Sequence, residues 1–160
     1  MRTANVLKGP HVSSAATVTT ASPKETFEFG ERLGGELKGG ELILLIGELG
    51  AGKTLLTKGI LCSLDFDPHE VTSPSFALVN LYHARYEVYH LDLWRLDRST
   101  DAAVAVGLDD ILEDERAIVI VEWAEKLRRT DFRSKTIEIR IKGDGDLPRQ
   151  IEIAHRHGSE

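Results

Sequence analysis

An apolar run that ends in a glycine-rich loop constrains the fold of this chain more than any other feature. Residues 41–47 read E-L-I-L-L-I-G, and residues 47–54 continue as G-E-L-G-A-G-K-T. The run has the length and composition of a parallel strand covered on both faces, and residues 53–64 are predicted to form a helix. The loop matches the phosphate-binding pattern G-x-x-x-x-G-K-[ST] in the strand–loop–helix context that the pattern requires. The sequence therefore predicts binding of a nucleoside triphosphate.

The glycines, Lys53 and Thr54 of this loop have expected roles in holding phosphates. Its glycines let successive backbone N–H groups point inward at an anion, and the following helix adds its positive N-terminal end. Lys53 is expected to reach the outer phosphates, and the Thr54 hydroxyl is expected to help hold Mg²⁺. No individual role is assigned to Glu48 or Leu49. The expected cofactor-binding segment comprises Gly47, Glu48, Leu49, Gly50, Ala51, Gly52, Lys53, Thr54 and Leu55.

Two acidic residues that follow apolar runs are candidates for a metal site beside the loop. Asp92 follows Y-E-V-Y-H-L, and Glu122 follows I-V-I-V. Ligands of open parallel sheets gather at the carboxyl ends of strands, so both acids could reach one crevice and hold Mg²⁺ or its water shell. An unpaired buried acid is costly, so ion pairs of Asp92 with Arg95 and of Glu122 with Lys126 are the structural alternatives. The residues alone leave both interpretations open.

Three further features near these motifs have roles that the residues do not decide. Trp123 could stack on a nucleotide base or pack in the core, and large aromatic residues are mostly found in cores. The segment V-T-S-P-S-F, residues 71–76, could be a plain turn or a nucleotide-sensing loop whose hydroxyls face the metal. His69, His83 and His90 show no spacing that indicates a metal site.

The remaining pattern predicts an α/β fold of the P-loop NTPase type. We expect a mostly parallel central sheet flanked by helices, with an antiparallel hairpin at one edge. Ser22, Pro23 and Glu25 form a capping signal that starts a helix, which ends at two glycines, residues 39–40. The other predicted elements are strands at 76–82, 86–91 and 117–123, a short helix at 107–114, and a hairpin formed by 135–141 and 149–154.

Length and composition favour one domain and exclude several classes of protein. Residues 22–155 are expected to form a single domain, preceded by a loose N-terminal extension, residues 1–21, in which residues 16–20 could form a short edge strand. The net charge of −6 argues against a broad nucleic-acid-binding face. One cysteine, Cys62, suits a reducing compartment, and no apolar run is long enough to cross a membrane. A cytoplasmic location is therefore expected.

Six motifs, in their order and spacing, resemble the TsaE (YjeE) family over roughly residues 22–142. The chain departs from the family pattern at Ser75, commonly Thr; at Trp94, commonly Tyr; and at Leu55, commonly a second Thr or Ser. The motifs are T-F-x-x-G-x-x-L, G-E-L-G-A-G-K-T, T-S-P-S-F, Y-H-L-D-L-W-R-L, G-L-D-D-I-L and V-E-W-A-E-K-L.

The resemblance implies a small bacterial ATPase needed to make the N6-threonylcarbamoyl modification of adenosine 37 in tRNA. Such a protein uses ATP and Mg²⁺ and works with two partners, TsaD, which transfers the threonylcarbamoyl group, and TsaB. Its hydrolysis of ATP resets that complex between turnovers and is weak in isolation. The acidic net charge fits a protein that contacts tRNA indirectly, through its partners.

The resemblance also implies roles for single residues. Lys53, Asp92 and Glu122 would be catalytic, with Asp92 as the Walker-B-like acid and Glu122 acting at the metal or water. Thr54 would join both acids at the metal, while Trp123 and Thr26 would lie close to the nucleotide.

Two other functions are compatible with a phosphate loop. A small-molecule kinase would need a second substrate pocket and an arginine-bearing lid, for which only Arg128 and Arg129 are candidates. A GTP-driven switch protein would need a guanine-reading N-K-x-D motif, which the sequence lacks. The hydrolase is therefore the preferred prediction.

Overall fold

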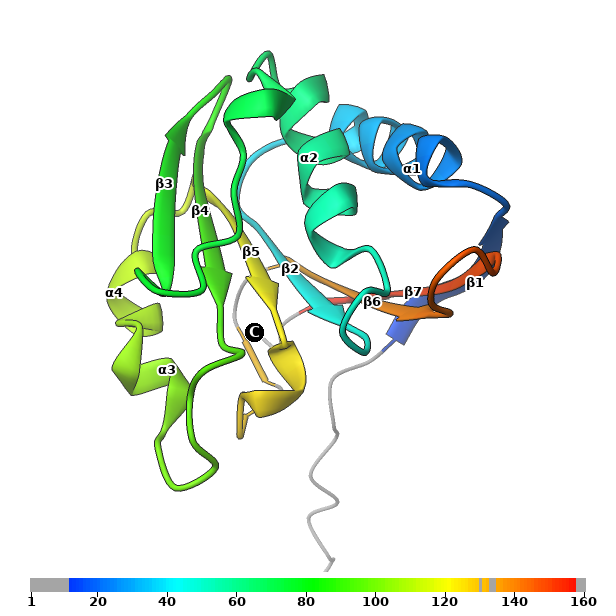
Figure 1. Cartoon of the computed structure of the whole chain (residues 1–160). Helices are drawn as coiled ribbons and strands as arrows, with labels where there is room; N and C mark the ends of the chain where they lie inside the picture. The colour runs from blue at the N-terminus through cyan, green and yellow to red at the C-terminus, as the bar shows by residue number, and fades with distance from the viewer. Residues whose placement is uncertain (1–11, 130, 133–134, 158–160) are drawn as a thin grey trace, which may run out of the picture.

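Seven strands form one sheet in the computed structural model, which describes residues 12–129, 131–132 and 135–157 (Figure 1). Their order across the sheet is β1-β7-β6-β2-β5-β4-β3. The strands are β1 (Val12–Thr20), β2 (Glu41–Ile46), β3 (Val79–His83), β4 (Glu87–Asp92), β5 (Ile118–Glu122), β6 (Lys135–Lys142) and β7 (Arg149–Arg156).

The centre of the sheet is parallel and both of its edges are antiparallel. β2 runs parallel to β5 and β6, and β4 runs parallel to β5. β3 pairs antiparallel with β4, and β7 pairs antiparallel with both β6 and β1. Every residue of β5 is buried, as are the first five of β2, which explains their unbroken apolar runs. The predicted α/β class, with its parallel centre and antiparallel edge hairpin, is confirmed.

Two long helices, α1 (Pro23–Glu36) and α2 (Lys53–Ser63), cover one face of the sheet (Figure 1). α1 begins as the capping signal predicts, because the Ser22 hydroxyl accepts a hydrogen bond from the N–H of Glu25. The two helices touch through glycine. A Cβ on Gly59 would lie 2.2 Å from the carbonyl oxygen of Phe27, so no larger residue fits there.

The other face is covered over β4 and β5 by α3 (Ala102–Ala105) and α4 (Leu108–Ile111) (Figure 1). The helix predicted at 107–114 is shorter than expected: Gly107 has left-handed backbone geometry, φ 65°, and α4 ends at Ile111. Single 3₁₀ turns occur at η1 (Pro68–Glu70) and η2 (Ala124–Lys126). Two apolar clusters result, one on each face of the sheet.

The N-terminal segment contributes more to the sheet than its composition indicates. β1 starts at Val12 rather than near residue 16, and it pairs with β7 through Thr20. Within the expected extension, residues 1–21, residues 12–20 therefore belong to the sheet, and residues 1–11 lie outside the described residues. The residues of β7 that pair with β1 lie 129 to 144 positions further along the chain, so no local sequence signal specifies this pairing.

Residues 76–78 form a turn instead of the start of the predicted strand at 76–82. Leu78 has φ 65°, and its N–H donates to the carbonyl oxygen of Pro74, so β3 begins only at Val79. Among the helices of the described residues, none is long and apolar enough to cross a membrane.

Candidate functional site

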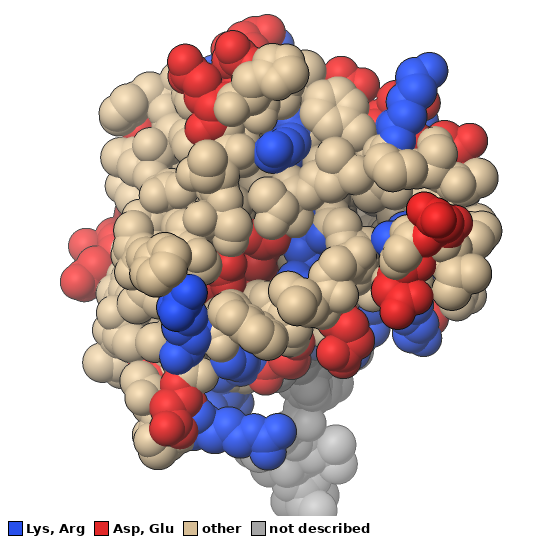
Figure 2. All heavy atoms as spheres, in the orientation of Figure 1, with Lys and Arg blue, Asp and Glu red and all other residues tan. Residues whose placement is uncertain are grey.

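A pocket of about 430 Å³ lies at the carboxyl ends of the parallel strands. Figure 2 shows acidic and basic side chains meeting in a hollow on this face. The phosphate loop leaves β2 here, while Asp92 ends β4 and Glu122 ends β5. Because these two acids are direct partners in the parallel register, both carboxylates lie beside the loop. The lining residues are Leu49, Gly50, Gly52, Lys53, Thr54, Leu55, Ser73, Ser75, Asp92, Trp94, Arg95, Glu122 and Trp123.

The backbone of the loop needs glycine at its two ends. A Cβ on Gly47 would lie 2.7 Å from the carbonyl oxygen of Ile141 in β6, so the loop and that strand touch directly. Gly52 has φ 109°, which side-chain-bearing residues rarely adopt, and it is the N-cap of α2 without any side-chain cap. The first N–H groups of α2 therefore need acceptors from outside the helix, such as phosphate oxygens.

Lys53 is the buried cation of the pocket and is only 5% exposed. Its Nζ donates to the carbonyl oxygens of Gly47 (2.5 Å) and Glu48 (2.9 Å) and lies 4.1 Å from the centre of the Trp123 ring. Burial lowers the pKa of Lys53, and the nearby carboxylate of Glu122 opposes that shift. The acceptors of these two hydrogen bonds are neutral carbonyl oxygens, so the positive charge of the ammonium can still be matched by a phosphate.

Glu122 is 2% exposed, and hydrogen bonds hold both of its carboxylate oxygens. The Thr54 hydroxyl donates to Oε1 at 2.9 Å, and Nε2 of His90 lies 2.9 Å from Oε2. Lys126, the alternative partner, instead donates to the carbonyl oxygens of Trp94 and Leu96. The structural alternative of an ion pair between Glu122 and Lys126 is therefore not formed.

Asp92 is 5% exposed and is bound by the segment that precedes β3. The Ser73 hydroxyl donates to Oδ2 at 2.6 Å, and the N–H of Trp94 donates to Oδ1 at 2.9 Å. Arg95 stacks over the Phe76 ring at 4.0 Å in place of pairing with Asp92. The hydroxyl-rich segment, residues 71–76, thus reaches the candidate metal acid directly.

The oxygen atoms of the site fit Mg²⁺ that arrives with phosphates. Thr54, Asp92 and Glu122 offer the hard oxygen ligands that this ion prefers. Among the described residues, no group of three or more His, Cys, Asp or Glu could hold a metal ion by itself. Mg²⁺ usually binds one or two carboxylates together with substrate phosphates and water, so this donor set suits a nucleotide-bound ion.

The other predicted site residues differ in how they lie. Trp123, with φ 58°, is half-buried at the pocket, and its ring centre lies 4.5 Å from that of Trp94. Thr26 is buried behind the loop, where its hydroxyl lies 2.7 Å from that of Thr20 and its methyl group faces Gly52. Contact of either residue with a nucleotide stays a prediction.

Sequence reasoning missed His90, which is fully buried against Glu122. A usable signal was present, because residues two apart on a strand face the same side and His90 precedes Asp92 by two.

Arg149 was also missed. Its guanidinium donates to the carbonyl oxygens of Gly50 and Ala51, and nothing local in its sequence marks a contact with the loop.

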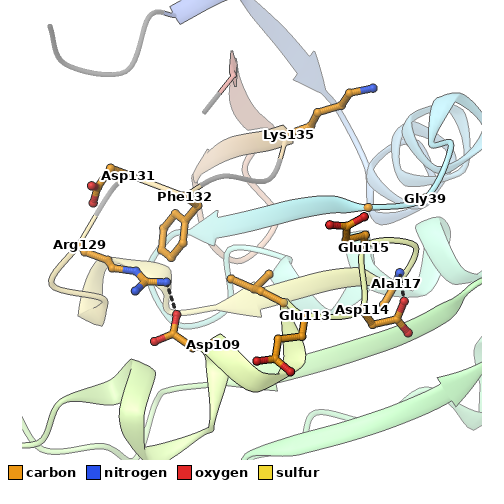
Figure 3. A pocket seen from close by; sticks show the side chains of 12 residues that line it. Gly39, Asp109, Glu113, Asp114, Glu115, Ala117, Arg129, Asp131, Phe132 and Lys135 are labelled. Carbon is orange, nitrogen blue, oxygen red and sulfur yellow. Dashed lines mark hydrogen bonds and ion pairs between the residues drawn. The ribbon is translucent and has the colours of Figure 1, made fainter. Parts of the chain in front are cut away.

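A second pocket, of about 770 Å³, opens at the amino ends of β2, β5 and β6. Figure 3 shows several carboxylates around it, and the guanidinium of Arg129 facing Asp109. None of the residues predicted for the nucleotide and metal site lines this pocket.

Comparison with known proteins identifies the family. The model of the family described as "Threonylcarbamoyl adenosine biosynthesis protein TsaE" matches residues 20–151. The chain belongs to the TsaE family. The TsaE family is thus confirmed as the source of the sequence resemblance, and its description places it in the biosynthesis of threonylcarbamoyladenosine.

Individual TsaE relatives agree with this assignment. The chain is similar to proteins named tRNA threonylcarbamoyladenosine biosynthesis protein TsaE from Mycobacterium tuberculosis (36% identity, 82% of this chain and 81% of the relative) and Bacillus subtilis (32%, 82% and 80%). It is also similar to the crystal structure of Bacillus subtilis YdiB, with TM-score 0.67, 28% identity, and coverage of 91% of this chain and 88% of that one.

Proposed function

We propose that this TsaE-family protein is a Mg²⁺-dependent ATPase that serves the N6-threonylcarbamoyladenosine modification of tRNA. One observation carries the hydrolase part of the proposal: Lys53, Thr54, Asp92 and Glu122 come from three separate segments and line one pocket. This combination of a phosphate-binding lysine, a hydroxyl and two acids is what phosphoryl transfer from a nucleotide requires.

The loop and Lys53 would bind the phosphates and stabilise the charge that develops on them. The N-cap of α2, Gly52, provides no side-chain acceptor for the first N–H groups of the helix, and the Lys53 ammonium donates to the carbonyl oxygens of Gly47 and Glu48. Donors that are already in place need not reorganise when negative charge develops in the transition state. Such preorganisation is usually the largest single contribution to catalysis.

The two acids would divide the remaining work. Asp92 and Thr54 would supply oxygen ligands to Mg²⁺, which would neutralise phosphate charge when bound. Glu122, oriented by His90 on one oxygen, would accept a hydrogen bond from the attacking water and align it with the γ-phosphate. The Thr54 hydroxyl donates to Glu122, so ligation of Mg²⁺ by Thr54 would replace this hydrogen bond.

We further propose that TsaD and TsaB are the protein partners and that hydrolysis resets their complex between turnovers. The net charge of −6 supports a protein that leaves direct tRNA contact to its partners, and a cytoplasmic location suits this work.

Turnover measurements with purified components test the proposal. ATP hydrolysis by the chain should be slow alone and rise when the TsaB–TsaD pair is added, and tRNA should gain threonylcarbamoyladenosine only in the complete mixture. Unchanged hydrolysis on adding the pair would contradict the partner assignment. A phosphorylated metabolite formed without partners would indicate a kinase, and preference for GTP would indicate a switch protein.

A further inference from the structure

Arg149, the first residue of β7, ties the phosphate loop to the turn between β6 and β7. Its Nε donates to the carbonyl oxygen of Ala51 at 2.9 Å, and its Nη2 donates to that of Gly50 at 3.2 Å. The other N–H groups of this guanidinium donate to carbonyl oxygens of the turn, at Asp144 (3.2 Å), Gly145 (3.1 Å) and Leu147. All five donors of the side chain are therefore used by backbone carbonyls.

These contacts control the direction of the loop's peptide groups. In a trans peptide the C=O and the next N–H point in opposite directions. Because Arg149 holds the carbonyl oxygen of Ala51 on its own side, the N–H of Gly52 points the other way, and Gly52 lines the nucleotide pocket. An inward-pointing N–H at this position is what a phosphate oxygen needs.

The charge of Arg149 adds to this geometry. Within the described residues its hydrogen bonds all go to neutral carbonyls, and it forms no ion pair with a carboxylate. A guanidinium stays protonated at any physiological pH. A permanent positive charge therefore lies directly behind the loop, where it favours binding of an anion on the other side.

The turn between the strands is built around this side chain. Gly143 has φ 122°, and a Cβ there would lie 2.7 Å from the carbonyl oxygen of Pro148 and 3.1 Å from Cδ of Arg149. The loop also touches β6 where Gly47 meets the carbonyl oxygen of Ile141. Two separate contacts thus join the β6–β7 hairpin to the loop, one at each end of it.

We infer that Arg149 is a positioning residue that holds the phosphate loop in its binding conformation before the nucleotide arrives. The inference deepens the proposed function and rests on it for the identity of the ligand. A loop that is already ordered loses less conformational freedom on binding, so Arg149 should act mainly on nucleotide affinity.

Three variants of the full chain test this role: Arg149→Ala, Arg149→Lys, and Arg140→Ala as the matched control. Arg140 lies in the same hairpin, but its guanidinium pairs with Glu138 on the sheet, whereas that of Arg149 binds the loop. Amide hydrogen exchange over residues 47–54, measured without nucleotide, reports the order of the loop directly. Titration with Mg·ATP and steady-state hydrolysis report Kd, KM and kcat.

Arg149→Ala should speed exchange in the loop and weaken Kd and KM for Mg·ATP by about tenfold, with a much smaller change in kcat. For Arg149→Lys, the exchange rate, Kd and KM should lie between those of Arg149→Ala and those of the unmodified chain. A lysine ammonium keeps the positive charge but cannot bridge the loop and the turn as the planar guanidinium does. Arg140→Ala should match the unmodified chain in all three measurements.

Loop exchange and Kd that are unchanged in a folded Arg149→Ala protein would overturn the inference. If that variant does not fold, Arg149→Lys decides by the same criteria. Equal losses in both Arg149 variants and in Arg140→Ala would also overturn it, since they would indicate general damage to the hairpin. The exchange measurement needs no ligand, so it still separates the variants if the chain proves to bind no ATP and the proposed function fails.

Discussion

The two ends of the parallel strands carry two pockets that differ in more than size. The pocket at the amino ends is larger, about 770 Å³ against about 430 Å³, and several carboxylates surround it (Figure 3). Its one ion pair among the described residues, Asp109 with Arg129, has side chains that are 71% and 42% exposed. In the smaller pocket, Lys53, Asp92 and Glu122 are each at most 5% exposed.

The difference lies in how the charged groups are held. Each acid of the smaller pocket is bound by donors from other segments: Ser73 reaches Asp92, while Thr54 and His90 reach Glu122. Such a network fixes side chains in a setting where charge interactions are strong. The carboxylates at the amino ends are exposed to water, which screens their charge. Burial and shared partners therefore distinguish the candidate nucleotide pocket from the larger one, and volume does not.

The largest effect is expected from Lys53→Ala, which removes the buried cation of the smaller pocket. Loss of the ammonium leaves phosphate charge unmatched, so Mg·ATP affinity or turnover should fall by roughly 100-fold or more. Lys135→Ala is the matched control, because Lys135 lines the larger pocket. Titration with a fluorescent ATP analogue and a phosphate-release assay measure both effects. Near-normal turnover in Lys53→Ala would remove the distinction between the pockets.

Glu122→Gln should separate chemistry from binding. The amide keeps the size of the side chain but cannot act as a base, so single-turnover hydrolysis should slow by about 100-fold, with Kd for Mg·ATP changed far less. Glu113→Gln makes the same change in the larger pocket and should leave both values unaltered. A Glu122→Gln protein that loses binding and turnover equally would argue against a role for Glu122 at the water.

A smaller effect is expected from His90→Leu, which leaves Oε2 of Glu122 without its buried partner. Groups that orient a catalytic side chain typically contribute about 10-fold to 100-fold, so kcat should fall while KM stays close to normal. His90→Gln retains an N–H donor at the position of Nε2 and should recover much of the loss. Equal kcat values in the two variants would show that His90 only fills space. Thermal unfolding of each variant provides the stability control.

The smallest effect is expected from Asp109→Asn at the rim of the larger pocket. Its ion pair with Arg129 is exposed and should contribute less than about 1 kcal/mol to the free energy of unfolding. Urea unfolding measures that contribution, and ATP turnover should stay within twofold of the unmodified chain. A tenfold loss of turnover would give the larger pocket a part in the function and reverse the comparison.

The elements around the site were predictable where one short segment carries the whole signal. The β2–loop–α2 unit follows from the apolar run and the glycine pattern, and the capped start of α1 follows from Ser22 and Glu25. The start of β1 at Val12 and the turn before β3 were not, because pairing with β7 and the left-handed Leu78 depend on distant or unusual backbone contacts.

By itself, the sequence determined the phosphate loop, the two acids and the α/β class, because local periodicity and motif spacing encode each of them. Only the tertiary structure decided which partners those groups take. Thr54 and Glu122 are 68 positions apart, His90 and Glu122 are 32 apart, and Ala51 and Arg149 are 98 apart. The parallel register places Asp92 beside Glu122, and a hairpin from the far end of the chain supports the loop. Such contacts depend on how strands are ordered in the sheet, which no short stretch of sequence specifies.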